Sequence, residues 1–135
     1  MQMGMDLVVT SGAMATLLDE AARAEPDECC GLLLGEANRI VEVRPAANVA
    51  AEPRRHFEID PAALIAAHRA ARAGGLAVLG YYHSHPAGKA EPSAADRAQA
   101  GGDGRIWAIV ASGEVRFWRD LPNGFDMLPS RVLEG

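Results

Sequence analysis

Short apolar runs alternate with polar and glycine-containing segments along this chain, a pattern that predicts strands interleaved with helices. The run Leu7–Val9 is short enough to form an edge strand. After it, Ser11 is a candidate N-cap for a helix, because apolar side chains then recur at i, i+3, i+4 and i+7, at Met14, Leu17, Leu18 and Ala21. We expect this helix to end at Pro26, since proline lacks the amide hydrogen that a helix interior needs.

Two further apolar runs predict a hairpin. Gly31–Gly35 and Ile40–Val43 have the length of strands, and the polar segment Glu36–Arg39 between them has the composition of a tight connection. Residues 44–58 are rich in proline, alanine, asparagine and arginine, so we expect an exposed loop there.

A second helix is predicted after Asp60, an N-cap residue that is followed by a first-turn proline. It runs to about Ala73, where two glycines end it. Its apolar face contains Leu64, Ile65, His68 and Ala71. The next run, Leu76–Tyr82, is almost continuously apolar and predicts a strand that is buried on both faces.

The last third of the chain predicts one more helix and a hairpin. The helix begins at Ser93, and strands over 106–111 and 114–119 are joined by Ser112-Gly113, a two-residue turn signature. Hairpins are thus mixed with crossover helices, so the fold class is α/β or α+β, with a single mixed sheet flanked by helices. A length of 135 residues predicts one domain over 1–135.

Bulk properties narrow the choice of partner and compartment. The formal charge of −5 and the pI near 5.3 argue against a nucleic-acid partner, because phosphate binding needs a basic surface. Cys29 and Cys30 are adjacent and cannot readily form an unstrained disulfide with each other. The N-terminal stretch MQMGMDLVVTSG has neither a basic segment nor a long apolar run. We therefore expect a cytoplasmic protein without a membrane anchor; its oligomeric state is left open.

The segment His83-Ser84-His85-Pro86 contains the most informative chemistry. Side chains alternate faces along a strand, so His83 and His85 point the same way and can bind one ion. Asp96, in the first turn of the next helix, can offer a third ligand. Two histidines and one carboxylate leave a fourth position open for water, as in catalytic rather than structural zinc sites.

Each part of this pattern also has a simpler interpretation. Paired histidines on a strand are often ordinary surface residues, and Ser93 with Asp96 forms a helix-capping box. The two features in succession are more specific than either one. His68 belongs to the apolar face of its helix, and His56 lies in a loop without a partner in sequence, so neither is included in the predicted site.

These residues resemble the JAMM (MPN-plus) metallopeptidase family. The family signature is H-S-H-P, six residues, Ser, two residues, Asp, and the chain matches it at every defined position from His83 to Asp96. The family also places an acid before a Cys-Gly-Leu-Leu strand, and Glu28 occupies that position. The likeness extends from the first helix to the last hairpin. It implies a cytidine-deaminase-like fold of the small prokaryotic, stand-alone type.

The resemblance also implies roles for individual residues. His83, His85 and Asp96 would bind one zinc ion per chain, and Glu28 would take the proton of the metal-bound water and pass it to the leaving amine. Ser93 would stabilise the oxyanion, although its hydroxyl is also needed to cap a helix. Cys29 and Cys30 are expected to be buried packing residues, since nothing near them in sequence would lower a thiol pKa.

The sequence leaves two alternatives to a metallopeptidase open. A RadC-like protein linked to DNA repair shares part of the pattern from His85 to Asp96, and the family includes scaffolds that have lost the metal. The acidic charge disfavours the first alternative and the intact ligand set disfavours the second.

The implied substrate is the C-terminal tail of a small ubiquitin-like or sulfur-carrier protein, hydrolysed at an amide bond. We expect the tail to bind as an added strand at a free sheet edge beside the site. A mobile loop around Gly88 and Lys89 is expected to close over it.

Overall fold

The computed structural model describes residues 6–135, and residues 1–5 of the N-terminal stretch discussed above lie outside this range. Eight strands and three helices follow one another as β1 (Leu7–Thr10), α1 (Ser11–Ala24), β2 (Cys30–Glu36), β3 (Arg39–Ala46), α2 (Pro61–Arg72), β4 (Ala77–Ser84), α3 (Ala94–Gln99), β5 (Ile106–Ala111), β6 (Glu114–Leu121), β7 (Gly124–Leu128) and β8 (Ser130–Leu133). The elements alternate as the apolar pattern predicts.

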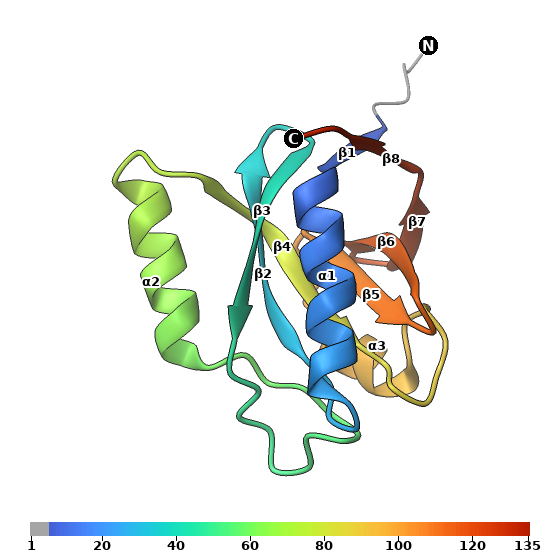
Figure 1. The fold of residues 1–135 in the computed structure, drawn as a ribbon. Helices are drawn as coiled ribbons and strands as arrows, with labels where there is room; N and C mark the ends of the chain where they lie inside the picture. The colour runs from blue at the N-terminus through green and yellow to red at the C-terminus, as the bar shows by residue number, and fades with distance from the viewer. Residues whose placement is uncertain (1–5) are drawn as a thin grey trace.

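The strands form one mixed sheet in the order β7-β6-β5-β4-β2-β3-β1-β8. The hairpins β2–β3, β5–β6 and β6–β7 are antiparallel, whereas β4–β5, β1–β3 and β1–β8 are parallel. The sheet curls around α1, and α2 covers the opposite face (Figure 1). This is the single mixed sheet flanked by helices that the sequence predicts.

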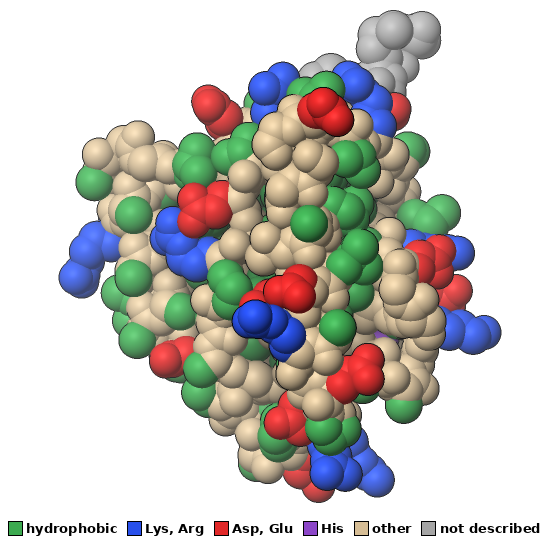
Figure 2. Space-filling model, in the orientation of Figure 1, with side chains coloured by type: hydrophobic (Ala, Val, Ile, Leu, Met, Phe, Trp, Pro, Cys, Tyr) green, Lys and Arg blue, Asp and Glu red, His purple; other side chains and the backbone are tan. Residues whose placement is uncertain are grey.

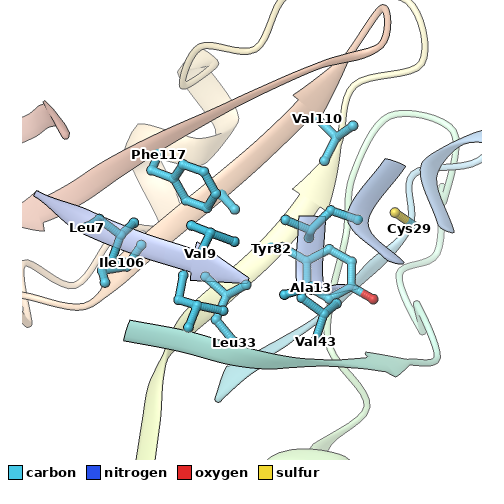
Figure 3. Close-up of a cluster of buried hydrophobic side chains, with 13 residues drawn as sticks. Leu7, Val9, Ala13, Cys29, Leu33, Val43, Tyr82, Ile106, Val110 and Phe117 are labelled. Atoms are coloured by element: carbon cyan, nitrogen blue, oxygen red, sulfur yellow. The ribbon is translucent and has the colours of Figure 1, made fainter. Parts of the chain in front are cut away.

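The core beneath α1 shows why this helix forms where it does. Leu17 is fully buried, and the partly buried residues Met14, Leu18 and Ala21 pack beside it, so the predicted i, i+3, i+4, i+7 face is confirmed. The residues labelled in Figure 3 fill the space between the helix and the sheet: Leu7, Val9, Ala13, Cys29, Leu33, Val43, Tyr82, Ile106, Val110 and Phe117. Gly31 allows the Tyr82 ring to pack closely, since a Cβ there would lie 2.4 Å from it.

Local signals at most element boundaries are confirmed. Asp60 caps α2 by accepting from the Ala62 amide, and Ser112 and Gly113 both have positive φ in the β5–β6 turn. The N-cap of α1 is Thr10 rather than the predicted Ser11. Thr10 has an extended backbone and its side chain accepts from the Ala13 amide, while Ser11 is already helical.

Four expectations about elements are wrong. β1 is not an edge strand, because β8, which the sequence did not predict, pairs with its outer side. Ile65 of α2 is 55% exposed, because the helix contacts the sheet through a narrow stripe at Leu64 and Ala67. β4 is buried only toward its C-terminal end. The loop predicted over 44–58 begins after β3 ends at Ala46.

Candidate active site and metal centre

The end of β4 places two imidazoles on one side of the sheet. His83 is the second-to-last residue of the strand and is 1% exposed, and His85 follows directly after the strand. Their Nε2 atoms lie 3.1 Å apart. Ser84 points to the other face, where its hydroxyl accepts from the Cys29 amide at 2.9 Å. The alternation that the sequence predicts therefore brings both histidines to one point.

The start of α3 brings a carboxylate to the same point. Ser93 and Asp96 form a reciprocal capping box: the Ser93 hydroxyl accepts from the Asp96 amide, and the Asp96 carboxylate accepts from the Ser93 amide. The same carboxylate lies 3.0 Å from Nε2 of His83 and 3.1 Å from Nε2 of His85. The capping box thus orients the carboxylate toward both imidazoles.

Neighbouring groups hold the two rings in place. Nδ1 of His85 lies 2.7 Å from the carbonyl of Lys89, which can only accept a hydrogen bond. Neutral His85 therefore carries its proton on Nδ1 and presents a free lone pair on Nε2, as a metal ligand must. The ring of Phe57 stacks on His83 with 4.2 Å between centroids, and Trp107 meets His83 edge-on.

In the metal-free chain, burial and hydrogen bonds shift the pKa of all three side chains. Burial lowers the pKa of His83, which keeps this imidazole neutral. Burial alone would raise the pKa of Asp96, but hydrogen bonds with His83 and His85 outweigh it and hold that pKa well below its usual range. Burial likewise opposes a charge on His85, yet its contacts with Asp96 and the Lys89 carbonyl raise its pKa overall. Asp96 is thus ionised and His83 neutral, as metal ligands must be, whereas His85 must release any proton on Nε2 before it can bind a metal.

This donor set fits a zinc ion. The three side chains each offer one ligand atom, and three such atoms about 3 Å apart can all lie about 2.0–2.1 Å from one point. Two nitrogens and one carboxylate oxygen suit zinc better than calcium or magnesium, which prefer oxygen alone. The three side chains that could hold such an ion are His83, His85 and Asp96, which the sequence predicts as ligands.

Glu28 lies beside these ligands. It immediately precedes β2, is 7% exposed, and its Oε1 has no hydrogen-bond partner among the described residues. Burial raises the pKa of Glu28 to about 7, with smaller opposing effects from His85, which lowers it, and Asp96, which raises it. A carboxyl group with such a pKa can both accept and release a proton near neutral pH.

A cavity of about 400 Å³ joins the catalytic candidates. Glu28, His85 and Ser93 line it together with Arg54, Arg55 and the loop from Pro86 to Pro92. The cavity is large enough for a few residues of an extended chain and too small for a folded protein. A substrate amide bond in this cavity can thus lie beside Glu28, His85 and Ser93, while His83 and Asp96 are buried behind its wall.

The two roles expected of Ser93 are chemically compatible. A hydroxyl group has one donor and two acceptor positions. Capping uses Ser93 Oγ only as an acceptor from the Asp96 amide, at 3.0 Å. Its own hydrogen is therefore free to be donated into the cavity.

His56 and His68 are not part of this group, and the two cysteines beside Glu28 are buried packing residues, as the sequence predicts. His56 is exposed, with its Nε2 3.9 Å from Glu52, and His68 is half-buried on α2. Cys29 and Cys30 are free and buried, and burial raises the pKa of both thiols, that of Cys30 to about 12. Burial therefore disfavours the reactive thiolate form of both residues.

The structure places both the loop and the sheet edges that were expected to receive the substrate. Nδ1 of His85 is bound to the Lys89 carbonyl, and the buried residue Ala90 accepts a hydrogen bond from Trp118 Nε1. These bonds anchor the loop as a wall of the cavity, and its closure over a substrate stays a prediction. The sheet edges are β7 and β8, and β4 is central, so strand addition at an edge beside the site is not available within residues 6–135.

Three contributors to the site were missed in the sequence. Phe57 stacks on His83, the Lys89 carbonyl selects the His85 tautomer, and the Asn48 amide donates to the Glu28 carbonyl at 2.9 Å. Phe57 and Asn48 lie in the segment predicted as an exposed loop, and no periodic pattern distinguishes them there. The one signal that could have indicated a buried side chain is that Phe57 is a lone aromatic residue in a polar loop.

Comparison with known proteins finds one matching family model and two named relatives. Residues 10–121 match the family model described as prokaryotic homologs of the JAB domain. The chain is 40% identical over 93 residues to a protein of Haloferax volcanii named desampylase, an alignment covering 67% of each chain. It is 36% identical over 97 residues to a Thermus thermophilus protein named probable TtuB-protein conjugate cleaving protease, covering 72% of this chain and 65% of that protein.

The fold is shared with solved structures. A structure described as JAMM, a metalloprotease-like zinc site in the proteasome and signalosome, superposes with a TM-score of 0.62 at 20% identity. That superposition covers 96% of this chain and 100% of the other. The same arrangement of strands and helices thus recurs at low sequence identity.

Proposed function

The chain belongs to the prokaryotic JAB-domain family of JAMM-type hydrolases, and we propose that it is a zinc-dependent isopeptidase. Its substrate in this proposal is the amide bond that joins the C-terminal tail of a small ubiquitin-like or sulfur-carrier protein to another group. The observation that carries the proposal is the convergence of His83, His85 and Asp96 beside Glu28, a buried carboxyl with an unpaired oxygen. A rigid metal ligand set next to a free proton acceptor is the requirement of metal-assisted amide hydrolysis.

In this proposal His83, His85 and Asp96 hold the zinc ion. When bound, zinc supplies Lewis acidity, which polarises a carbonyl group and lowers the pKa of water. The Lys89 carbonyl keeps His85 in the ligating tautomer, and Phe57 keeps the His83 ring from turning.

Glu28 is the proposed proton carrier. Its Oε1 accepts a proton from the attacking water and later donates one to the departing amine nitrogen. Its burial supports this double role, because a pKa of about 7 leaves neither form strongly favoured. Ser93 is the proposed hydrogen-bond donor to the substrate carbonyl oxygen as negative charge develops there.

The cavity supports a narrow tail as the substrate. A space of about 400 Å³ admits small residues on both sides of the scissile bond, and Ala87 and Gly88 form part of its wall. Two relatives named for cleaving activity, one of them on protein conjugates, agree with a tail attached to a second protein.

The test uses purified protein and three substrates. The first is a sulfur-carrier protein joined through its terminal Gly-Gly pair to a lysine side chain. The second is the same conjugate with the Gly-Gly pair replaced by bulky residues, and the third is casein. We expect rapid cleavage of the first conjugate alone; equal hydrolysis of all three, or cleavage of casein only, would rule the proposal out.

Two variants separate chemistry from folding in the same assay. Glu28→Gln should retain zinc and lose about 10²–10⁴-fold in turnover, the usual contribution of a positioned general acid–base. Glu36→Gln, an exposed glutamate at the far end of the same strand, should cleave at the wild-type rate. Loss of zinc from Glu28→Gln would show that Glu28 is a ligand and that its proposed role is wrong.

The two alternatives left by the sequence find little support. A non-catalytic scaffold requires a broken ligand set, whereas His83, His85 and Asp96 come together here. The matching family model is that of JAB-domain homologues, and Lys, Arg, Asp and Glu side chains are interspersed over the face seen in Figure 2. That face offers no basic stripe for a DNA-repair role.

A further inference from the structure

Glu28 is held in place through its main chain. Its amide donates to the Pro53 carbonyl at 2.8 Å, and its carbonyl accepts from Asn48 Nδ2 at 2.9 Å. By contrast, Oε1 of its side chain has no hydrogen-bond partner among the described residues. The direction of the carboxyl group therefore depends on how the segment 47–58 grips the backbone of Glu28.

Asn48 organises this segment with all of its hydrogen-bonding capacity. Its Oδ1 accepts from the amides of Ala50 and Glu58, each at 3.0 Å. Its Nδ2 donates to the carbonyls of Glu28 and His56. An asparagine side chain has two donors and an acceptor oxygen with two lone pairs, so no capacity is left unused. One side chain thus shapes the segment and ties it to Glu28.

Cys29, the residue after Glu28, is held by hydrogen bonds to β4. The Cys29 amide donates to Ser84 Oγ, and the Ser84 amide donates to the Cys29 carbonyl at 3.2 Å. Ser84 lies between the two histidines, so this pair of bonds sets Cys29 relative to the ligands. Glu28 is therefore bonded to the segment 47–58, and its neighbour Cys29 is bonded to β4, the strand whose end carries the histidines.

We propose that Asn48 is a positioning residue for Glu28: it holds the backbone of the proton carrier so that the carboxyl group faces the metal ligands and the cavity. The inference rests on the proposed function, because it assigns Asn48 a role in the same reaction. Asn48 does not line the cavity, so its proposed effect on the reaction passes through Glu28. Its other bonds, to His56 and Glu58, hold the chain on either side of Phe57. A displacement of the carboxyl group by about 1 Å is enough to slow such a reaction about 10²-fold.

Asn48→Asp removes the two donor bonds of the side chain and keeps its acceptor oxygen. The aspartate oxygen can still accept from the Ala50 and Glu58 amides, whereas the donors to Glu28 and His56 are lost. We expect kcat to fall about 10–100-fold, with KM changed less than about 3-fold and zinc content unchanged. In the zinc-free protein, the Glu28 amide should exchange its hydrogen about 10-fold faster or more, since its partner segment is loosened.

Asn38→Asp is the matched control. Asn38 also donates its side-chain amide to a main-chain carbonyl, that of Asp6, but it lies in the β2–β3 turn at the other end of the strand. This variant should keep the wild-type kcat and the wild-type exchange rate at Glu28. Asn48→Ser, which is neutral and too short to span the same atoms, should reproduce the effect if the aspartate variant does not fold.

The outcomes distinguish this inference from the proposed function. An Asn48→Asp protein with wild-type kcat and wild-type exchange at Glu28 would overturn the role of Asn48 and leave the isopeptidase proposal intact. Loss of zinc in parallel with kcat would also overturn it, because Asn48 would then support the metal centre rather than the proton carrier. Absence of cleavage by the wild-type protein would overturn the proposed function, while the exchange measurement would still report on the bond.

Discussion

Among single residues, Glu28 differs most from what its neighbours in sequence indicate. It lies between Asp27 and two cysteines, after a proline, where an exposed acid would be unremarkable. In the fold it is buried, and no cation among the described residues forms an ion pair with it. Removal from water disfavours the charged form, which is why its pKa rises to about 7.

This burial predicts a pH-dependent cost to stability in the zinc-free protein. Unfolded Glu28 releases its proton near pH 4.5, and folded Glu28 near pH 7. Between these values the folded state binds more protons, so the free energy of unfolding falls as pH rises from about 4.5 to 7 and then levels off. Glu28→Gln, which does not ionise, should be about 1–3 kcal/mol more stable than wild type at pH 8 and nearly equal at pH 4.

Urea unfolding of the zinc-free proteins at the two pH values measures this difference. Glu36→Gln provides the control, because Glu36 is exposed at the other end of β2 and should give no comparable gain at pH 8. An equal gain from both substitutions would indicate a general effect of net charge. A gain from Glu28→Gln that is larger at pH 4 than at pH 8 would contradict the argument.

Ser93 combines a structural and a proposed chemical role, and the two can be separated. Ser93→Ala should cost about 1 kcal/mol of stability through loss of the cap. It should also lower turnover by up to about 10²–10³-fold through loss of one oxyanion donor. Thr10→Ala removes the corresponding cap of α1 and should reduce stability similarly without slowing turnover. Equal turnover in the two variants would show that Ser93 is only a cap.

At the level of elements, the candidate metal centre joins the end of β4 to the start of α3. His83 and Asp96 are 13 residues apart, and the intervening loop is anchored by Lys89 and Ala90. A bound ion would therefore tie a strand to a helix and stabilise the folded state relative to the unfolded chain.

Removing any ligand should abolish this tie. We expect about one zinc per chain in the wild type, and no stoichiometric zinc after alanine substitution of His83, His85 or Asp96. Chelation should lower the Tm of the wild type by roughly 5–10 °C and leave the Tm of these variants unchanged. Elemental analysis and thermal scans measure both quantities.

Asp120 offers a matched control for these substitutions. It is another buried carboxylate, 2% exposed, and it accepts from the amides of Gly101 and Gly102 rather than facing histidines. Asp120→Ala should lower Tm and still bind one zinc. Full zinc occupancy in the double variant His83→Ala/His85→Ala would show that the metal lies elsewhere.

Individual helices and strands also show where the hydrophobic pattern of the sequence fails to predict structure. The helix face of α1 was predicted because its spacing reflects one long contact with the core. The predicted apolar face of α2 was too broad. Ile65 is turned by about 100° around the helix from Leu64, so it lies outside the narrow contact with the sheet. β7 and β8 are short and mostly exposed, so no apolar run marked them.

For the molecule as a whole, sheet order decides how a substrate can approach. β4 lies between β2 and β5, so its end opens into the cavity and not onto a free edge. The segment 47–58 and the loop from Pro86 to Pro92 line this cavity, and they contribute Arg54, Arg55 and Lys89. No helix within residues 6–135 has the length and apolar character needed to cross a membrane.

The sequence by itself determined those features that depend on neighbours within one turn or one strand. The spacing of His83 and His85, the capping box of Ser93 and Asp96, and the Ser112-Gly113 turn are set by the geometry of single elements. The JAMM signature combines such local features, and its three predicted ligands, His83, His85 and Asp96, converge in the structure.

Only the tertiary structure decided how these groups work together. Glu28 is fixed by Asn48, 20 residues away, and Cys29 by Ser84, 55 residues away. The pKa of Glu28 and the stacking of Phe57 on His83 also arise from contacts that no spacing rule encodes. Hydrogen bonds and burial between distant segments depend on how the strands are ordered in the sheet, and that order is a property of the whole fold.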